Sequence, residues 1–127
     1  MLGKMVSNYF ISQNENEVVV TSRKNSGDKI TTKNIYFDAL NDKLEVIISE
    51  VKPEYVINCI GAIKPNIDEQ NNTSVKNAFY INSYFPIYLS QLSILYNFKY
   101  IQIGTDCVFS GNKGNYSENS YQDAIDI

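Results

Sequence analysis

The chain has 127 residues, of which 43% are hydrophobic, and 14 Asp and Glu outweigh 11 Lys and Arg to give a formal net charge of −3. This length suits one globular domain with a real core. The negative charge argues against nucleic acid as a partner, and no apolar run approaches the ~18 residues of a membrane-spanning helix. With no His in the sequence, a His-based catalytic triad or zinc site is excluded, and we expect no metal.

The cysteines and the N-terminus bear on the cellular compartment. Cys59 and Cys107 each lie within an apolar stretch, where a buried thiol in a reducing compartment is the ordinary interpretation. The first residues lack the charged, apolar and small segments of a signal peptide. We therefore expect a cytoplasmic protein.

The predicted elements alternate between helices and strands. Apolar residues at helical spacing begin at the very first residues, with no strand before them: Leu2, Met5, Val6, Tyr9 and Phe10. Apolar or β-branched runs then predict strands, helical spacing predicts further helices, and Pro86 interrupts the last of these. In chain order these elements are a strand at 17–23, a strand at 34–38, a helix at 39–52, a strand at 55–63, a helix at 75–98, a strand at 99–106 and a loop from 108 to 127.

This alternation predicts an α/β fold with a parallel sheet, in which ligands bind at the carboxyl ends of the strands. Small residues, polar residues and glycines follow the predicted strands: Thr21-Ser22-Arg23, Asp38-Ala39, Gly61-Ala62-Ile63 and Gly104-Thr105-Asp106. A cation and a carboxylate in this set would suit a phosphorylated ribose and an adenine amine. Turn glycines, a solvated Arg and a capping Asp explain each residue equally well on its own.

Several segments together resemble a known family. IQIGTDCVFSGNKGNYSENS (101–120) resembles the S-T-D-Y-V-F-x-G…Y-x-E segment of the extended short-chain dehydrogenase/reductases, and most of all their dTDP-4-dehydrorhamnose reductase branch. YVINCIGAIKPN resembles the fourth strand of that branch, and AFYINSYFPIYLSQLS resembles its next helix, with an Asn-x-x-x-Pro pattern at Asn82 and Pro86. The opening MLGK resembles the end of the glycine-rich phosphate loop G-x-x-G-M-L-G-K. The resemblance covers nearly the whole chain in the expected order.

The resemblance implies a Rossmann-like doubly wound parallel sheet that binds NADP or NAD. Residues 1–127 would then be a partial NAD(P)-binding domain, truncated at both ends, without the first strand and without the C-terminal part that holds the substrate. In the strand order 3-2-1-4-5 the first strand is central. Its absence would leave the second and fourth strands with unpaired inner edges.

Roles in cofactor binding follow from the same resemblance. Gly3 would be the third glycine of the phosphate loop, and the amides of the first helical turn, around Leu2, would face the pyrophosphate. Arg23 would lie beside the adenosine ribose and pair with a 2′-phosphate, which favours NADP over NAD; an exposed Arg after a strand is the alternative. Asp38 and Ala39 would contact the adenine.

Further roles concern the nicotinamide and the substrate. Gly61, Ala62 and Ile63 would line the ribose and nicotinamide side. Thr105 would be the catalytic hydroxyl that hydrogen-bonds the reacting sugar carbonyl. Asn82 matches the helix Asn that the family links to a proton relay, and an amide that bonds a neighbouring loop is the alternative.

The chain departs from the family pattern in the segment after Thr105. Cys107 replaces the Tyr that precedes V-F, and Ser110 stands where an Asp or a small residue is common. Tyr116 and Glu118 lie in the substrate-side loop and receive no role.

The largest departure concerns proton transfer. The family's acid is the Tyr of Y-x-x-x-K, expected about two dozen residues after Thr105, and its Lys lowers the pKa of that Tyr. Tyr121 is followed four residues later by Ile125, so the pair is absent from the sequence. Without the proton donor and the substrate part, we expect these residues by themselves to be inactive.

The sequence therefore predicts a fragment of an NAD(P)-dependent nucleotide-sugar reductase of polysaccharide biosynthesis, which transfers hydride to a 4-keto sugar nucleotide. An epimerase or dehydratase of the same family and a non-catalytic dinucleotide-binding module are the alternatives. The expected partners are the nucleotide sugar, held through the missing C-terminal part, and a second copy in a homodimer. A signalling receiver domain does not fit, because it needs a carboxylate pair after its first strand and a Lys after its fifth.

Overall fold

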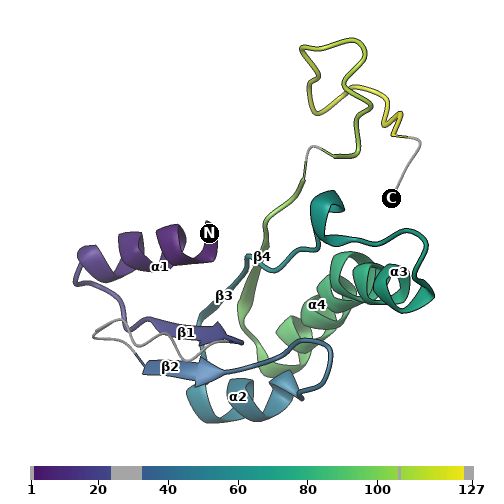
Figure 1. The fold of residues 1–127 in the computed structure, drawn as a ribbon. Coiled ribbons are helices and arrows are strands. Elements are labelled where there is room, and N and C mark those ends of the chain that lie inside the picture. The colour runs from purple at the N-terminus through teal and green to yellow at the C-terminus, as the bar shows by residue number, and fades with distance from the viewer. Residues whose placement is uncertain (1, 24–32, 106, 125–127) are drawn as a thin grey trace.

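The computed structural model describes residues 2–23, 33–105 and 107–124. In chain order the elements are α1 (Leu2–Ser12), β1 (Val19–Ser22), β2 (Lys33–Tyr36), α2 (Leu44–Val51), β3 (Tyr55–Asn58), α3 (Asn72–Phe79), α4 (Phe85–Tyr96) and β4 (Lys99–Gln102) (Figure 1). A 3-10 turn (Lys64–Asn66) follows β3, and a π-helical turn (Tyr80–Tyr84) joins α3 to α4. The predicted order of helices and strands is confirmed, and the fold class is α/β. Met1, most of the segment between β1 and β2, Asp106 and Ile125 lie outside the described residues.

The strands form two parallel pairs. β1 pairs with β2, with Val19 opposite Lys33, and β3 pairs with β4, with Asn58 opposite Gln102. Within the described residues the two pairs are separate sheets, so β1 and β3 each have a strand neighbour on one edge alone. These are the pairs that the expected order 3-2-1-4-5 predicts on either side of its central strand.

Side chains that bond the backbone set several boundaries. The strand predicted at 55–63 ends at Asn58, whose Oδ1 accepts a hydrogen bond from the Ile60 amide at 3.0 Å and so turns the chain out of the strand. The helix predicted at 39–52 begins at Leu44 instead. Residues before it form a turn in which Asp38 Oδ1 accepts from the Leu40 amide at 3.1 Å. α2 ends where Lys52 adopts a left-handed conformation, before Pro53.

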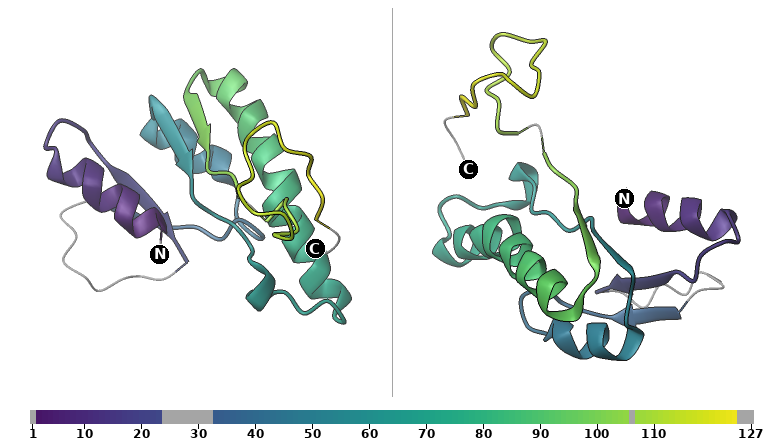
Figure 2. Two further views of the ribbon diagram at one scale, coloured as in Figure 1. Left: turned by 90° about the horizontal axis from the view of Figure 1, so that it is seen from above. Right: turned by 180° about the vertical axis from the view of Figure 1, so that it is seen from behind.

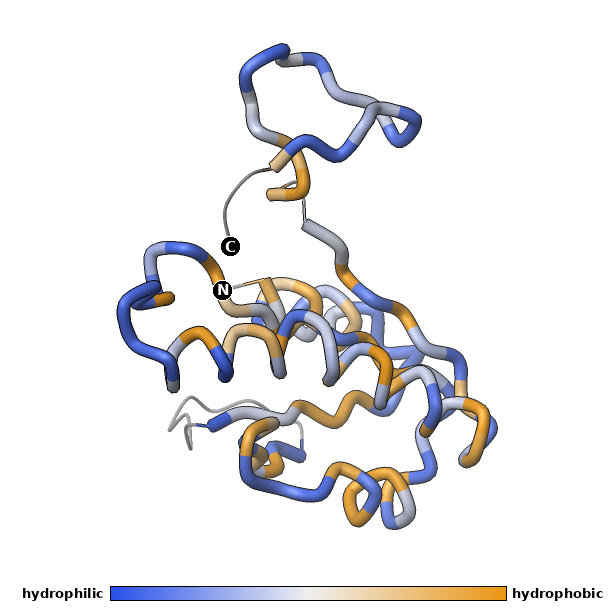
Figure 3. Tube along the Cα trace, turned by 90° about the vertical axis from the view of Figure 1, so that its right-hand side faces the viewer, coloured by the Kyte–Doolittle hydropathy of each residue, from blue (hydrophilic) through white to orange (hydrophobic). Residues whose placement is uncertain are grey.

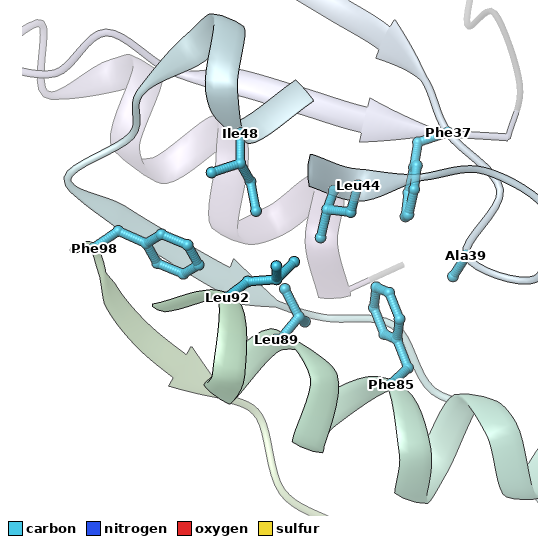
Figure 4. Packing of buried hydrophobic residues seen from close by; sticks show 8 residues of the cluster. All are labelled: Phe37, Ala39, Leu44, Ile48, Phe85, Leu89, Leu92 and Phe98. Atoms are coloured by element: carbon cyan, nitrogen blue, oxygen red, sulfur yellow. The ribbon is translucent and has the colours of Figure 1, made fainter. Parts of the chain in front are cut away.

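The core joins the carboxyl end of β2 to α2, α4 and the start of β4. Its buried members, drawn in Figure 4, are Phe37, Ala39, Leu44, Ile48, Phe85, Leu89, Leu92 and Phe98. Phe85 and Leu89 are the most deeply buried large side chains, at 2% and 1% exposure. The Phe37 and Phe85 rings lie 6.1 Å apart, which fixes the end of β2 beside the beginning of α4.

Helices lie on both sides of the strands. α1 occupies one side, and α2 and α4 occupy the other (Figures 1 and 2). The predicted apolar face of α1 is largely uncovered, because Leu2, Met5 and Tyr9 are 44%, 64% and 61% exposed.

The strand at β3 was also expected to be covered on both faces. Val56 packs against the core and Asn58 is buried. Tyr55, on the other face of β3, is exposed, as is Ile101 of the partner strand β4. The described helices therefore cover one face of the β3–β4 pair better than the other.

Residues 107–124 form a loop that projects away from the helices and strands (Figure 1). The loop is mostly hydrophilic apart from its base (Figure 3). At that base the amide of Ala124 donates to the carbonyl of Val108, at 3.2 Å, so the two ends of the loop meet. No helix in the described part of the chain is long and apolar enough to span a membrane.

Candidate functional site

The loops that follow β2, β3 and β4 emerge at one end of the structure. β3 and β4 are parallel and in register, so the segments after Asn58 and Gln102 leave the same edge. The end of β2 lies against α4 through the core, and the π turn before α4 contacts the loop after β3. Packing thus brings together segments that lie far apart in the sequence.

Asn82 fastens the loop after β3 to the helix. Its Oδ1 accepts a hydrogen bond from the Ala62 amide at 2.8 Å, and its Nδ2 donates to the Ala62 carbonyl, also at 2.8 Å. A side chain on Gly61 would place its Cβ 3.9 Å from the same Oδ1. Of the two sequence interpretations of Asn82, the structure shows the amide that bonds a neighbouring loop. The backbone at Ala62 is consequently held in one orientation, beside the exposed Ile63.

Thr105 lies in the open segment after β4, with an exposed side chain. Its Oγ1 accepts a hydrogen bond from the Cys107 amide at 3.1 Å. Because a hydroxyl has one donor and two acceptor positions, this contact leaves its hydrogen able to point to another oxygen. A Cβ added to the preceding Gly104 would have no other atom within 4 Å, so there is open space for a ligand to approach the backbone there.

The beginning of α1 lies against the end of β3. A Cβ on Gly3 would come within 3.4 Å of Cys59 Cβ, which is ordinary van der Waals contact, so the close approach of helix and strand leaves room for a methyl group. The first turn of α1 contains no acidic side chain, and Leu2 is 44% exposed. Nothing in this turn would repel an anion at the positive end of the helix. Burial raises the pKa of the Cys59 thiol, which keeps it protonated.

Asp38 and Ala39 are engaged within the protein. The two carboxylate oxygens of Asp38 accept from the Leu40 amide and from Asn41 Nδ2, at 3.1 and 3.0 Å, as a turn-capping Asp does. Ala39 is 6% exposed and its methyl group belongs to the core, which leaves its backbone for any ligand contact. Arg23 follows β1 with an exposed side chain.

Two polar networks were missed in the sequence. Asn58, at 4% exposure, donates to Gln102 Oε1 at 2.9 Å across the β3–β4 pair. In the projecting loop, the amide and Oγ of Ser110 donate to the two oxygens of Asp123 at 2.7 and 2.9 Å, and Ser110 Oγ also bonds the Tyr116 hydroxyl. For the first network the sequence offered one signal, the side-chain amide of Asn58 within an apolar strand. The second had none, because Ser110 and Asp123 lie 13 positions apart in a loop.

An open groove of about 720 Å³ lies between the turn after β2 and the α3–π segment. It is lined by Leu40, Asn41, Lys76, Asn77, Phe79, Tyr80, Ser83 and Tyr84. None of the predicted ligand-contacting residues lines it. Among the described residues, no three His, Cys, Asp or Glu side chains lie close enough together to hold a metal ion.

Residues 1–125 match the profile of the NAD dependent epimerase/dehydratase family. The chain belongs to this family. Its members use NAD(P), and the resemblance seen in the sequence is confirmed at this level. No curated protein sequence matches the chain.

A solved structure has the same fold. The crystal structure of a hypothetical dTDP-4-dehydrorhamnose reductase from Sulfolobus tokodaii superposes with a TM-score of 0.73, at 21% sequence identity. The alignment covers 94% of this chain and 42% of that one, so the present chain spans less than half of the reductase's length. At this identity the likeness establishes the Rossmann-like fold of the aligned part.

The strand-end residues fit the cofactor of this family. The exposed Gly61, Gly104 and Thr105 leave the backbone accessible after β3 and β4, and the acid-free first turn of α1 suits a pyrophosphate. The amides of that turn, around Leu2 and Gly3, would face the pyrophosphate, and Arg23 would pair with a 2′-phosphate. The loop clamped at Ala62 would border the nicotinamide. These assignments are predictions.

Proposed function

We propose that this chain forms the NAD(P)-binding part of a nucleotide-sugar reductase that acts on a 4-keto sugar in the manner of dTDP-4-dehydrorhamnose reductases. Three observations support this proposal: the family match over residues 1–125, the shared fold, and the T-D-x-V-F-x-G block after β4. The observation that carries it is the placement of Thr105 and the Ala62 loop at the same edge of one parallel strand pair.

In the proposed reaction, a dihydronicotinamide bordered by the Ala62 loop would supply the hydride for the keto carbon of the sugar. Thr105 donates a hydrogen bond to the carbonyl oxygen as negative charge develops there, while the Cys107 amide holds the hydroxyl in place. The proton that completes reduction comes from a donor outside the Thr105 segment, since residues 1–127 contain no Tyr-x-x-x-Lys.

The cofactor half of the proposal is tested by titrating the full-length protein with NADPH and NADH. Arg23→Ala should weaken NADPH binding about tenfold and change NADH binding less than twofold, because the 2′-phosphate alone loses its partner. Lys33→Ala is the matched control, since this exposed cation lies at the opposite end of the β1–β2 pair. Equal loss for both cofactors would argue against the NADP assignment.

The catalytic half is tested with dTDP-4-dehydrorhamnose, by following loss of the reduced nicotinamide. Thr105→Val, which keeps the shape and removes the hydroxyl, should lower kcat about a hundredfold with little change in KM, and Thr105→Ser should restore most of it. Isomerised sugar without net consumption of cofactor would identify an epimerase. Cofactor binding without turnover of any 4-keto sugar would identify a non-catalytic module.

A further inference from the structure

The interruption predicted at Pro86 in the helix at 75–98 takes the form of a π-helical turn between α3 and α4. α3 ends at Phe79, and the amide of Phe85 donates to the carbonyl of Tyr80, five residues back, in a π-helical turn. α4 begins directly afterwards, with Pro86 in its first turn. Such π turns occur frequently at functional sites.

The proline accounts for the break. In an uninterrupted α-helix the ring of Pro86 would meet the carbonyl of Asn82, four residues back, and would leave that carbonyl without its donor. A π turn immediately before the proline places it at the start of a new helix, where its missing N–H is not needed. Pro86 therefore favours two helices joined by the turn over one continuous helix.

The same turn holds the residue that clamps the β3 loop. Asn82 is the middle residue of the turn, and both polar atoms of its amide bond the backbone of Ala62 at 2.8 Å. Each residue of an α-helix advances about 100° around the axis. If the turn were wound as an α-helix, it would no longer hold its extra residue. Asn82 would then rotate by a large angle relative to α4, and its side-chain amide would move away from Ala62.

We propose that Pro86 is a positioning residue for the cofactor loop: by excluding a continuous helix, it maintains the π turn that aims Asn82 at Ala62. The consequence for NAD(P) rests on the proposed function, whereas the consequence for the Ala62 amide does not. Pro86 itself touches neither the Ala62 loop nor the ligand in this scheme; it acts through Asn82.

The test is Pro86→Ala in the full-length protein, with three readouts. The alanine regains an N–H and is a better helix former, so the midpoint of thermal unfolding stays constant or rises. Hydrogen exchange of the Ala62 amide accelerates about tenfold, and the dissociation constant for NADPH rises about tenfold, because two hydrogen bonds are lost. A purely structural role would lower the unfolding midpoint together with the affinity.

A double variant isolates the route of the effect. Asn82→Ala alone should give the same exchange and affinity changes, and Pro86→Ala combined with Asn82→Ala should be no worse than Asn82→Ala. Gln91→Ala, at an exposed position of α4 away from the turn, is the matched control and should change none of the readouts.

Three results would overturn the proposal: unchanged exchange at Ala62 in Pro86→Ala, additive losses in the double variant, or a lower unfolding midpoint. If the unsubstituted protein binds no NADPH, the proposed function fails. Exchange at Ala62 and the unfolding midpoint still decide the role of Pro86 in that case.

Discussion

Two leucines of one helix offer a direct test of the core. Leu89 of α4 is 1% exposed and lies in the cluster with Phe85 and Leu92, whereas Leu95, six residues further along, is 73% exposed. Leu→Ala at either position changes helix propensity equally, so the difference between the two variants measures burial alone. At Leu89 the change removes buried carbon atoms and leaves a cavity.

The expected cost at Leu89 is about 3–4 kcal/mol, within the range for buried Leu→Ala changes. For a single domain with a total stability of roughly 5–15 kcal/mol, such a loss is large and easily measured. Leu95→Ala should change stability by less than about 0.5 kcal/mol, as surface substitutions do. Urea unfolding followed by circular dichroism, with the same slope required of both variants, gives the two values.

Two outcomes would refute this reasoning. A cost at Leu89 below about 1 kcal/mol would mean that α4 does not pack as the structure shows. A cost at Leu95 equal to that at Leu89 would mean that the outer face of α4 is covered in solution, as a homodimer through this helix would require.

Three further predictions concern single contacts. Asn71→Ala should cost about 1 kcal/mol in urea unfolding, because Asn71 Oδ1 caps α3 by accepting two backbone amides at 2.9 and 3.3 Å; no measurable cost would contradict the cap. Gly3→Ala should leave the midpoint of thermal unfolding unchanged or raise it, since the added methyl group only touches Cys59. A lower midpoint would show that the added Cβ and the Cβ of Cys59 come closer than 3.4 Å. The backbone amide of Ser110 keeps the pKa of Asp123 below its ordinary value. The ionised carboxylate therefore stabilises the closed loop fully at pH values above the ordinary Asp pKa. This contribution is lost as the pH falls through the lowered pKa of Asp123 in the folded protein. The Ser110 amide resonance should follow that titration, and Asp123→Asn should abolish it.

Local signals accounted for the order of the elements. Apolar runs and helical spacing are properties of neighbouring residues, so they predicted three helical and four extended segments without any knowledge of packing. Boundaries were less accurate, since they depend on single side-chain contacts. The strand at β3 stops at Asn58 because that side chain bonds the Ile60 amide, and the helix at α2 starts late because Asp38 organises a turn before it.

Residue roles at the site were predicted unevenly for the same reason. Glycine and threonine after the strands were found from their position in the sequence, and Thr105 does lie in an open segment with a hydroxyl hydrogen available. Asp38, by contrast, had two interpretations that the sequence could not separate. Its carboxylate proves to be turned into its own loop.

By itself, the sequence determined the α/β class, the order of elements, the loops that follow the strands and the family to which they belong, because all of these depend on local periodicity and short motifs. Only the tertiary structure decided that Asn82 clamps Ala62, that Asn58 bonds Gln102 and that Ser110 bonds Asp123. The first two contacts join residues 20 and 44 positions apart. Contacts of that kind arise from the packing of α4 and β4 against β3, and no local pattern encodes them.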